Sequence, residues 1–233
     1  MTHDPFFQAY DRDDIAFGFE PSAEVAAYLA QVSPTGLAID LGAGAGRNAL
    51  ALAQAGLQVR AFDMSKRGLV RLMERARLLG LDHLIETEVA DIRSLVLPVH
   101  EVSIVVATTI LDHMLLVDAL EVWKRIEASL TDDGVVYAEV HTTEDPGCRE
   151  LPGANNPFPR SETACSVKHY YQAGELLQMA SRSQSLRVLR YEERQEWDYT
   201  HGNEHHHGKA TLLAVRKGHY PPWYGHPLAF PKA

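Results

Sequence analysis

The sequence feature that most constrains the fold is a glycine-rich turn between an apolar segment and an alanine-rich run. Residues 37–40 are apolar up to Asp40, the turn follows as Leu41-Gly42-Ala43-Gly44-Ala45-Gly46, and residues 47–55 are rich in alanine and leucine before Gly56. This order predicts a strand, a tight turn, a helix and a C-terminal glycine cap. Because glycine lacks a β-carbon, such a turn lets the backbone approach a nucleotide-like ligand closely. The turn therefore predicts the first unit of an α/β sheet with a ligand site above it.

Strand and helix patterns alternate through the next part of the chain. We expect strands over 58–62, 85–89, 102–107 and 135–140, and helices over 65–79 and 115–130. Strands joined through helices pair in parallel. The pattern thus predicts an α/β fold, a Rossmann-like, doubly wound, seven-stranded and mostly parallel sheet.

The last third of the chain has a different pattern. A proline-containing loop is expected over 142–161 and a helix over 168–181. Two strands, 186–199 and 209–216, are joined by the connection 201–208 and predict a C-terminal antiparallel hairpin. We expect three parts overall, which are an N-terminal helical cap (1–35), the main domain (36–217) and a proline- and aromatic-rich C-terminal tail (218–233).

Composition excludes several classes of partner. The net charge of −9 argues against nucleic acid, whose phosphates select basic surfaces. No stretch approaches the roughly 20 apolar residues that span a bilayer, and residues 1–10 lack a secretory signal pattern. The two cysteines, Cys148 and Cys165, fit a reducing compartment. We therefore expect a cytoplasmic protein with a small-molecule partner, and no membrane or nucleic-acid partner; the oligomeric state is left open.

Three carboxylates follow consecutive predicted strands. Asp40 precedes the first turn glycine by two residues, Asp63 ends the second strand and Asp91 ends the third. Open α/β sheets bind ligands at this end of their strands, and an acid after the second strand suits ribose hydroxyls. The dinucleotide fingerprint Gly-x-Gly-x-x-Gly fails here, because its third glycine is replaced by Arg47. The alternative is that the three acids only cap helices and turns.

The run Asp40 to Ala53, DLGAGAGRNALALA, resembles the first motif of class I methyltransferases. Its Gly46-Arg47-Asn48 is particularly similar to the tellurite-resistance methyltransferase family. The resemblance covers roughly 36–217 and continues at Phe62-Asp63, Ala90-Asp91, Thr108-Thr109-Ile110-Leu111, Asn156-Pro157-Phe158-Pro159, Gly174-Glu175-Leu176 and the strand 210–217.

This resemblance implies S-adenosylmethionine as the cofactor. Asp63 would hold the ribose, and Asp91 with Ile92 would hold the adenine. The full set of cofactor residues that we expect is Asp40, Gly42, Ala43, Gly44, Gly46, Asn48, Asp63, Met64, Asp91, Ile92 and Thr108.

The implied activity is methyl transfer to a small electron-rich acceptor, namely an oxyanion, a chalcogen or a thiol. The sulfonium is a good leaving group, so catalysis can rest on in-line placement and exclusion of water. The alternatives are an O- or N-methyltransferase of a small metabolite, a non-catalytic nucleotide-binding module and an NAD-dependent dehydrogenase. An aromatic cover for the sulfonium, with core packing as its alternative, is predicted from Phe6, Phe7, Tyr10, Phe17 and Phe19.

A histidine-rich segment, His201-Gly202-Asn203-Glu204-His205-His206-His207, is the most distinctive local feature. In the tellurite-resistance family the matching connection helps to hold an oxyanion, together with the arginine that matches Arg47. This chain offers histidines where that family has arginines. Strand alternation places His205 and His207 on one face and His206 on the other.

Three interpretations of this segment stay open. His201, His205 and His207 bind the acceptor or transfer protons; or they bind a divalent metal with His141, Glu204 or a cysteine; or the turn has no chemistry. The first is preferred, with no metal expected. The candidate catalytic residues are Arg47, His113, His201, His205 and His207, where His113 is either a general base or a helix cap.

Overall fold

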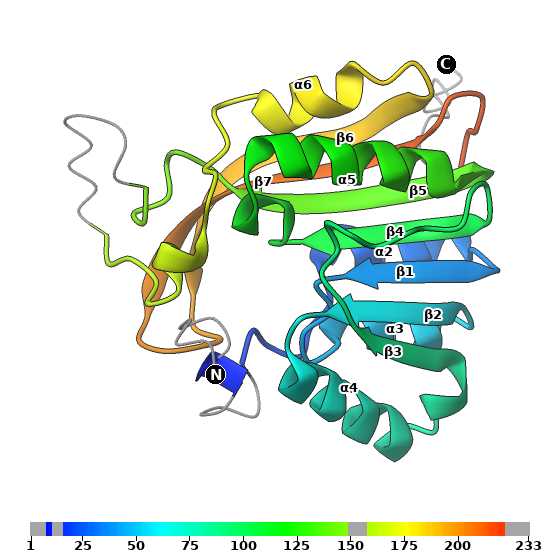
Figure 1. Cartoon of the computed structure of the whole chain (residues 1–233), viewed down its shortest axis with the longest axis horizontal. Helices are drawn as coiled ribbons and strands as arrows, with labels where there is room; N and C mark the ends of the chain where they lie inside the picture. The colour runs from blue at the N-terminus through cyan, green and yellow to red at the C-terminus, as the bar shows by residue number, and fades with distance from the viewer. Residues whose placement is uncertain (1–7, 11–15, 149–157, 222–233) are drawn as a thin grey trace, which may run out of the picture.

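The computed structural model describes residues 8–10, 16–148 and 158–221. Within these residues, one sheet of seven strands has the order β3-β2-β1-β4-β5-β7-β6 (Figure 1). Its strands are β1 (Leu37–Leu41), β2 (Gln58–Asp63), β3 (Ile85–Val89), β4 (Val102–Thr108), β5 (Leu130–His141), β6 (Leu186–Asp198) and β7 (His205–Arg216). Strands β1 to β5 pair in parallel, and β7 runs antiparallel to both β5 and β6. The predicted doubly wound, mostly parallel sheet with a C-terminal antiparallel hairpin is confirmed.

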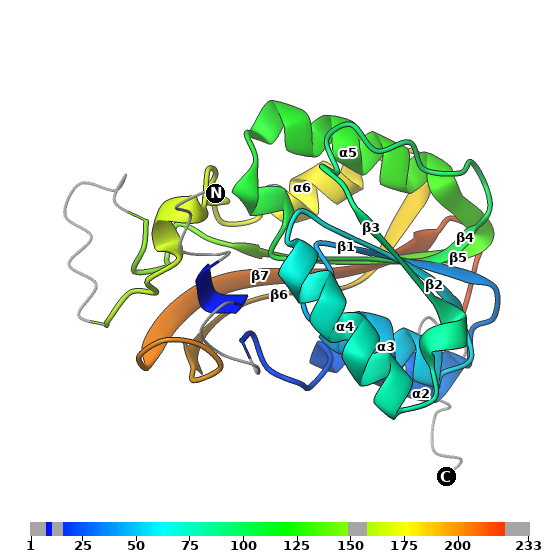
Figure 2. The same cartoon turned by 60° about the horizontal axis from the view of Figure 1, so that its bottom comes forward.

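Helices cover both faces of the sheet (Figure 2). One face carries α2 (Ala23–Val32), α3 (Arg47–Gln54) and α4 (Lys66–Leu78), and the other carries α5 (Leu116–Ser129) and α6 (Glu175–Ser181). Three short 3₁₀ helices lie in connections: η1 (Asp82–Leu84), η2 (Leu111–His113) and η3 (Ala164–Ser166).

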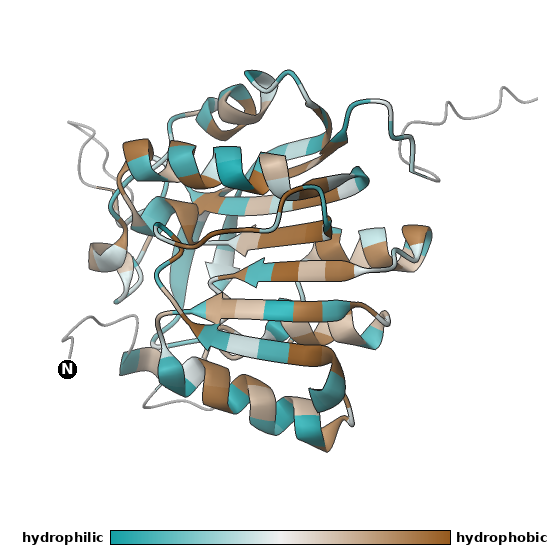
Figure 3. Ribbon diagram, turned by 45° about the vertical axis from the view of Figure 1, so that its right-hand side comes forward, coloured by the Kyte–Doolittle hydropathy of each residue, from teal (hydrophilic) through white to brown (hydrophobic). Residues whose placement is uncertain are grey.

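The core divides into two hydrophobic layers, one on each side of the sheet. Strand β4 is almost wholly buried, as expected for a continuous apolar strand covered on both faces, and Figure 3 shows the mainly hydrophobic central strands. Helix α4 starts where predicted, because the Ser65 hydroxyl accepts a hydrogen bond from the Gly68 amide.

The helix predicted over 168–181 is wrong in its first half. Helix α6 begins only at Glu175, after Gly174 in a left-handed conformation with φ of 74°. Before it, the amides of Lys168 and His169 donate to the carbonyl of Asp112, and Tyr171 forms a parallel bridge with Thr142. These long-range hydrogen bonds replace the helical ones.

The connection predicted over 201–208 is also too long. Strand β7 begins at His205, because residues 205–208 pair with 195–198 of β6. Asp198 lies opposite His205, and Glu196 lies opposite His207. At the start of β5, the pairing with β4 has an irregularity between Leu130 and Val135.

Some predictions fall on residues outside the described ranges: those for Phe6, Phe7, 149–157 and 222–233. Both cysteines are free thiols, with Cys148 buried and Cys165 exposed. Among the described residues, no helix has the length and apolar character needed to cross a membrane.

Candidate active site

A cavity of about 300 Å³ opens at the carboxyl ends of the central strands. Pockets for small molecules span roughly 300–1,000 Å³, so it suits a small ligand. One side is lined by the glycine turn and the strand ends: Gly42, Ala43, Ala45, Gly46, Arg47, Asn48, Thr108, Thr109 and Ile110. The opposite side is lined by the hairpin and its surroundings: His113, Glu139, His141, Thr163, residues 196–201, His207 and Lys209.

The glycine turn needs its glycines for both conformation and space. Gly42 has φ of +74°, and a β-carbon built on it would lie 2.9 Å from Ile110. Gly44 has φ of +53°, and a β-carbon there would collide with the Tyr10 hydroxyl. Left-handed conformations cost other residues free energy. Gly44 is therefore covered by Tyr10 and does not line the cavity.

Asp63 holds the glycine turn through hydrogen bonds, and Asp40 is buried beside the start of α3, where it accepts from the Ala49 amide. Asp63 accepts hydrogen bonds from the amides of Gly44 (2.8 Å) and Ser65 (2.6 Å). Burial raises the pKa of Asp63 and raises that of Asp40 to about 7. Both residues lie behind the cavity lining, so their contacts with a cofactor stay predictions.

The remaining predicted cofactor residues lie apart from the cavity. Asp91 forms an ion pair with Arg93 at 2.6 Å, and the hydrogen bonds from Arg93 lower its pKa. Ile92 is buried in the core, and Met64 is largely exposed. The structure thus brings together Gly42, Ala43, Gly46, Asn48 and Thr108 at the cavity, and the adenine role of Asp91 and Ile92 stays a prediction.

Asn48 joins three elements below the cavity. Its Nδ2 donates to the Thr108 hydroxyl at 3.0 Å, and its Oδ1 accepts from the Ser22 amide at 2.9 Å. All three residues are buried. These hydrogen bonds fix the start of α3 against the end of β4 and the start of α2.

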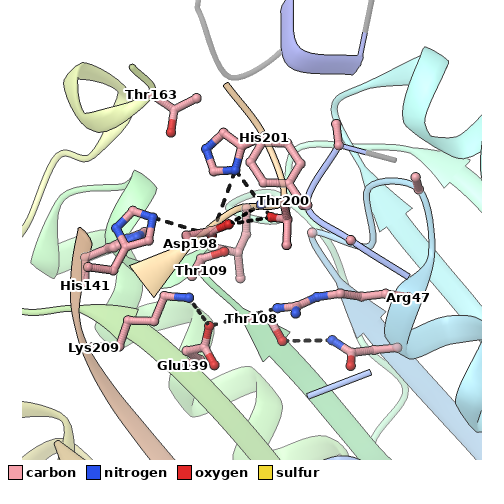
Figure 4. Close-up of a pocket in the computed structure, with 18 of the residues that line it drawn as sticks. Arg47, Thr108, Thr109, Glu139, His141, Thr163, Asp198, Thr200, His201 and Lys209 are labelled. Carbon is pink, nitrogen blue, oxygen red and sulfur yellow. Dashed lines mark hydrogen bonds and ion pairs between the residues drawn. The ribbon is translucent and has the colours of Figure 1, made fainter. Parts of the chain in front are cut away.

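Arg47 belongs to a buried charge network rather than standing as an isolated cation. It lies 4.0 Å from Glu139, and Lys209 lies 3.3 Å from the same carboxylate and 2.8 Å from Glu196. In Figure 4, Arg47 and Lys209 approach Glu139 from opposite sides. Burial alone would raise the pKa of Glu139, but Lys209 and Arg47 outweigh it and lower the pKa to about 2. Arg194 also lies 2.8 Å from Glu196 and 3.9 Å from Glu139, so each of the three cations has a carboxylate partner within the site.

The sequence motifs do not reveal this network, because its members look ordinary in the chain. Glu139 sits in the run 135–140 of β5, whose other residues are apolar, and Lys209 and Glu196 lie on neighbouring strands of the hairpin. A charged residue inside an apolar run of this kind is the one signal that was available.

Histidines and carboxylates form a second cluster beside this network. His207 Nδ1 lies 2.8 Å from Asp145, and its Nε2 lies 3.0 Å from His205 Nε2. His141 Nδ1 lies 2.5 Å from Asp112, whose side chain is fully buried. The predicted alternation is confirmed, since His206 stacks on Phe158 on the other face of β7.

Burial sets the charge state of two of these histidines. Desolvation lowers the pKa of His201 and of His207 to about 4 in each case. Both imidazoles are therefore neutral at neutral pH. Although burial would raise the pKa of Asp145, the hydrogen bond from His207 lowers it, so this carboxyl is ionised.

Four of the five predicted catalytic residues, Arg47, His113, His201 and His207, line the cavity. The fifth, His205, contacts His207 from behind. Sequence reasoning did not assign roles to Asp145 and Asp198, which become recognisable only when the fold brings them to the histidines.

Part of the N-terminal segment covers the cavity. Tyr10 is buried over the glycine turn, and the Phe17 ring lies 5.3 Å from the Tyr10 ring and 4.4 Å from that of His201. Phe19 instead lies under Arg75, outside the cavity. Tyr10 and Phe17 are thus placed both to pack against the domain and to enclose a ligand.

The profile of a family described as a methyltransferase domain matches residues 38–134. No match is found among curated protein sequences. The matched segment includes the glycine turn, β1 to β4 and α3 to α5.

Solved structures share the fold. TehB from Haemophilus influenzae is 21% identical with a TM-score of 0.66 over 84% of this chain, which spans only 63% of the TehB chain. A methyltransferase described as S-adenosylmethionine-dependent, from Methanosarcina mazei, is 16% identical with a TM-score of 0.62, over 84% of this chain and 98% of its own. The [4+2]-cyclase SpnF is 17% identical with a TM-score of 0.61, over 91% and 92%. The resemblance to class I methyltransferases of the tellurite-resistance type is confirmed at the level of fold, while the cyclase shows that one fold hosts different reactions.

Proposed function

Because a methyltransferase-domain profile matches residues 38–134 and an S-adenosylmethionine-dependent methyltransferase shares the fold, we propose that this chain transfers the methyl group of S-adenosylmethionine to a sulfur or other chalcogen atom of a small acceptor. The observation that carries this proposal is the continuity of the cavity. The same cavity is lined by Gly42 and Gly46 at one side and by His113, His141 and His207 at the other. A cofactor held on the turn and an acceptor held by the histidines would meet within it.

Catalysis of methyl transfer depends mainly on how the protein places the acceptor relative to the methyl group. When bound, S-adenosylmethionine would supply an activated methyl group on a sulfonium, which is a good leaving group; Gly42 and Gly46 would hold it beside an acceptor placed by His113, His141 and His207. A proton on the acceptor leaves to a nearby base or to water. The neutral imidazole of His201 can accept a hydrogen bond from such a proton, and because the pKa of His201 is lowered to about 4, the proton passes on to water.

The charge of the site bears on the class of acceptor. Arg47 and Lys209 are each paired with Glu139, and Lys209 also with Glu196. A small oxyanion would have to compete with these carboxylates, so it is the second candidate. A thiol or chalcogen acceptor needs no unpaired cation, which is why we place it first.

The test has two stages. Calorimetry with S-adenosylmethionine and S-adenosylhomocysteine should show binding of both. A labelled-methyl screen across thiols, selenols, selenite, tellurite, small alcohols and amines should then show transfer, strongest to a thiol or selenol; transfer strongest to selenite or tellurite would favour the oxyanion acceptor instead. We expect His207→Ala to reduce transfer at least 10-fold and to retain cofactor binding, whereas His206→Ala, on the opposite face of β7, should retain both.

The failing outcomes are distinct. If neither nucleoside binds at millimolar concentration, the whole proposal is wrong. Binding without transfer to any acceptor would support the non-catalytic module instead. Transfer only to alcohols or amines would show that the protein is a methyltransferase but that its acceptor is not a sulfur or chalcogen compound.

A further inference from the structure

Three potential metal ligands share one face of the β6–β7 hairpin. Asp198 lies directly opposite His205 in the strand register, and His207 lies two residues further along the same face. One atom from each of these side chains lies within 4.8 Å of the others. The strand pairing itself therefore assembles a His–His–carboxylate set.

The hydrogen bonds of the two histidines fix where their protons lie. His205 Nδ1 is 2.7 Å from the carbonyl oxygen of Asn203, which can only accept, so this nitrogen donates. His207 Nδ1 is 2.8 Å from the Asp145 carboxylate and also donates. When a ring with its proton on Nδ1 is neutral, its Nε2 carries a lone pair. The two Nε2 atoms face one another at 3.0 Å, an arrangement of two acceptors that a cation between them would stabilise.

The carboxylate is oriented in the same way. Asp198 Oδ1 accepts from the amide and the hydroxyl of Thr200 at 2.6 and 2.7 Å. Its Oδ2 faces the histidines, 3.7 Å from His207 Nε2. Around a tetrahedral zinc ion with bonds of about 2.05 Å, two ligand atoms lie about 3.3 Å apart. The distance of 3.0 Å between the two Nε2 atoms and that of 3.7 Å between His207 Nε2 and Asp198 Oδ2 lie on either side of this spacing.

Each potential ligand thus has its other polar atom held by a partner: Asn203 for His205, Asp145 for His207 and Thr200 for Asp198. Such outer partners, which set the tautomer and orientation of the ligand, are typical of metal sites. We propose that Asp198, His205 and His207 bind one divalent transition-metal ion, with Zn²⁺ as the first candidate for two imidazoles and one carboxylate.

Two neighbouring groups fit this role less well. In the set of His141, Asp145 and His207, the Asp145 carboxylate already accepts from His207. In the set of Asp112, His113 and His141, Asp112 already accepts from His141. These carboxylates orient the imidazoles and do not need an ion.

The proposed site opens onto the cavity, because Asp198 and His207 both line it. Three protein ligands leave at least one coordination position for water or an anionic atom of a ligand. If the methyl transfer proposed above holds, that position would take a thiolate or oxygen atom of the acceptor; binding of the ion itself does not depend on that function. His201 lies beside the site, with Nδ1 3.9 Å from Asp198 Oδ2 (Figure 4).

The experiment uses the full-length chain without a histidine tag, stripped with a chelator and dialysed. Titration with Zn²⁺ by calorimetry should give one ion per chain, and Co²⁺ should produce the visible absorption of a low-symmetry site. His205→Ala should weaken Zn²⁺ binding at least 100-fold, and Asp145→Asn about 10- to 100-fold, the range for outer partners. The matched control His206→Ala should bind Zn²⁺ like the unmodified protein, because its ring stacks on Phe158 on the opposite face.

S-adenosylmethionine binding by each variant, measured in parallel, shows that the variant is folded and separates this proposal from the previous one. Zn²⁺ bound without methyl transfer would keep the metal site and remove the proposed function. The metal proposal would be overturned if the chain binds no stoichiometric Zn²⁺, or if His205→Ala and His206→Ala bind it equally. It would also be overturned if nitrogen-15 spectra at neutral pH show that both ring nitrogens of His205 stay protonated after Zn²⁺ is added.

Discussion

The phenol oxygen of Tyr10 lies over Gly44 in the space that a β-carbon on this glycine would occupy. The contact joins the N-terminal segment to the middle of the turn beneath the cavity. Burial, and then the nearby Asp63, raise the pKa of Tyr10 well above its ordinary value, so the phenol is neutral. The carbonyl of Tyr10 also accepts from Arg67 Nε at 3.1 Å, which fixes the segment to α4.

This contact predicts a coupling between Tyr10 and Gly44. Gly44→Ala should lower the free energy of unfolding by about 2 kcal/mol, because it adds roughly 1–2 kcal/mol of left-handed strain to a clash with Tyr10. In a Tyr10→Ala background only the strain remains, so the same substitution should cost about 1 kcal/mol less. Urea unfolding of the four proteins measures the coupling. Additive effects would show that the segment does not rest on the turn in solution.

A second prediction concerns the hydrogen bond from Asn48 to Thr108. Asn48→Ala should lower the free energy of unfolding by about 2 kcal/mol, since it also leaves the buried Ser22 amide without its acceptor. Thr108→Val should cost about 1 kcal/mol, and the double variant should cost less than the sum by about 1 kcal/mol. We expect both variants to weaken cofactor binding, as both residues line the cavity. The thermodynamic cycle and calorimetry check these expectations, and the absence of coupling would contradict the hydrogen bond.

A third prediction follows from the buried charges. Glu139→Gln leaves the buried Lys209 with Glu196 alone and removes the carboxylate facing Arg47, so it should lower the free energy of unfolding by about 3 kcal/mol. Glu196→Gln is the matched control and should cost about 1 kcal/mol, because this side chain is 32% exposed.

The same Glu139→Gln variant should bind selenite and tellurite more tightly than the unmodified protein, since it frees positive charge at the cavity. Denaturant titration and calorimetry measure the two effects. An equal cost for both substitutions, with no gain in anion affinity, would contradict the proposed balance of charge.

Much of the fold could be predicted because its signals are local. The apolar run before Asp40, the glycines after it and Ser65 at the start of α4 each specify a nearby conformation. The helix predicted to start at Lys168 failed for the opposite reason. Its first amides bond to the carbonyl of Asp112, a partner more than fifty residues away that no local pattern reveals.

The site was predictable in part for the same reason. Strand alternation correctly placed His205 and His207 on one face. Their partners could not be assigned, because Asp145 lies 62 residues from His207 in sequence and meets it only through the pairing of β5 with β7. Arg47 was predicted to contact an anionic acceptor, yet its guanidinium lies 4.0 Å from the carboxylate of Glu139 on β5. The chemistry of these residues therefore depends on contacts that the tertiary fold creates.

The last prediction uses the carboxyl of Asp40, whose pKa burial raises to about 7. The folded protein binds this proton more tightly than the unfolded chain, where the pKa is about 4. The resulting stability is present in full below about pH 4 and is lost as the pH rises through about 7. Asp40→Asn keeps a neutral acceptor at every pH. The unmodified protein should therefore lose about 4 kcal/mol relative to Asp40→Asn between pH 4 and pH 8, at about 1.4 kcal/mol per unit of pKa difference.

Urea unfolding of both proteins at unit intervals of pH measures this difference, and the comparison cancels the parallel contribution of Asp63, whose pKa burial also raises. Two parallel stability curves would show that Asp40 is ionised throughout.

A bound sulfonium would favour the ionised carboxylate, so S-adenosylmethionine should bind the unmodified protein more tightly as the pH rises through 7. Asp40→Asn should show no such gain, because it has no proton to release. The sulfur of S-adenosylhomocysteine is uncharged and lacks this attraction, so the affinity of the protein for S-adenosylhomocysteine should change less with pH than its affinity for S-adenosylmethionine. The comparison separates the effect of the sulfonium charge from the effect of the nucleoside shape.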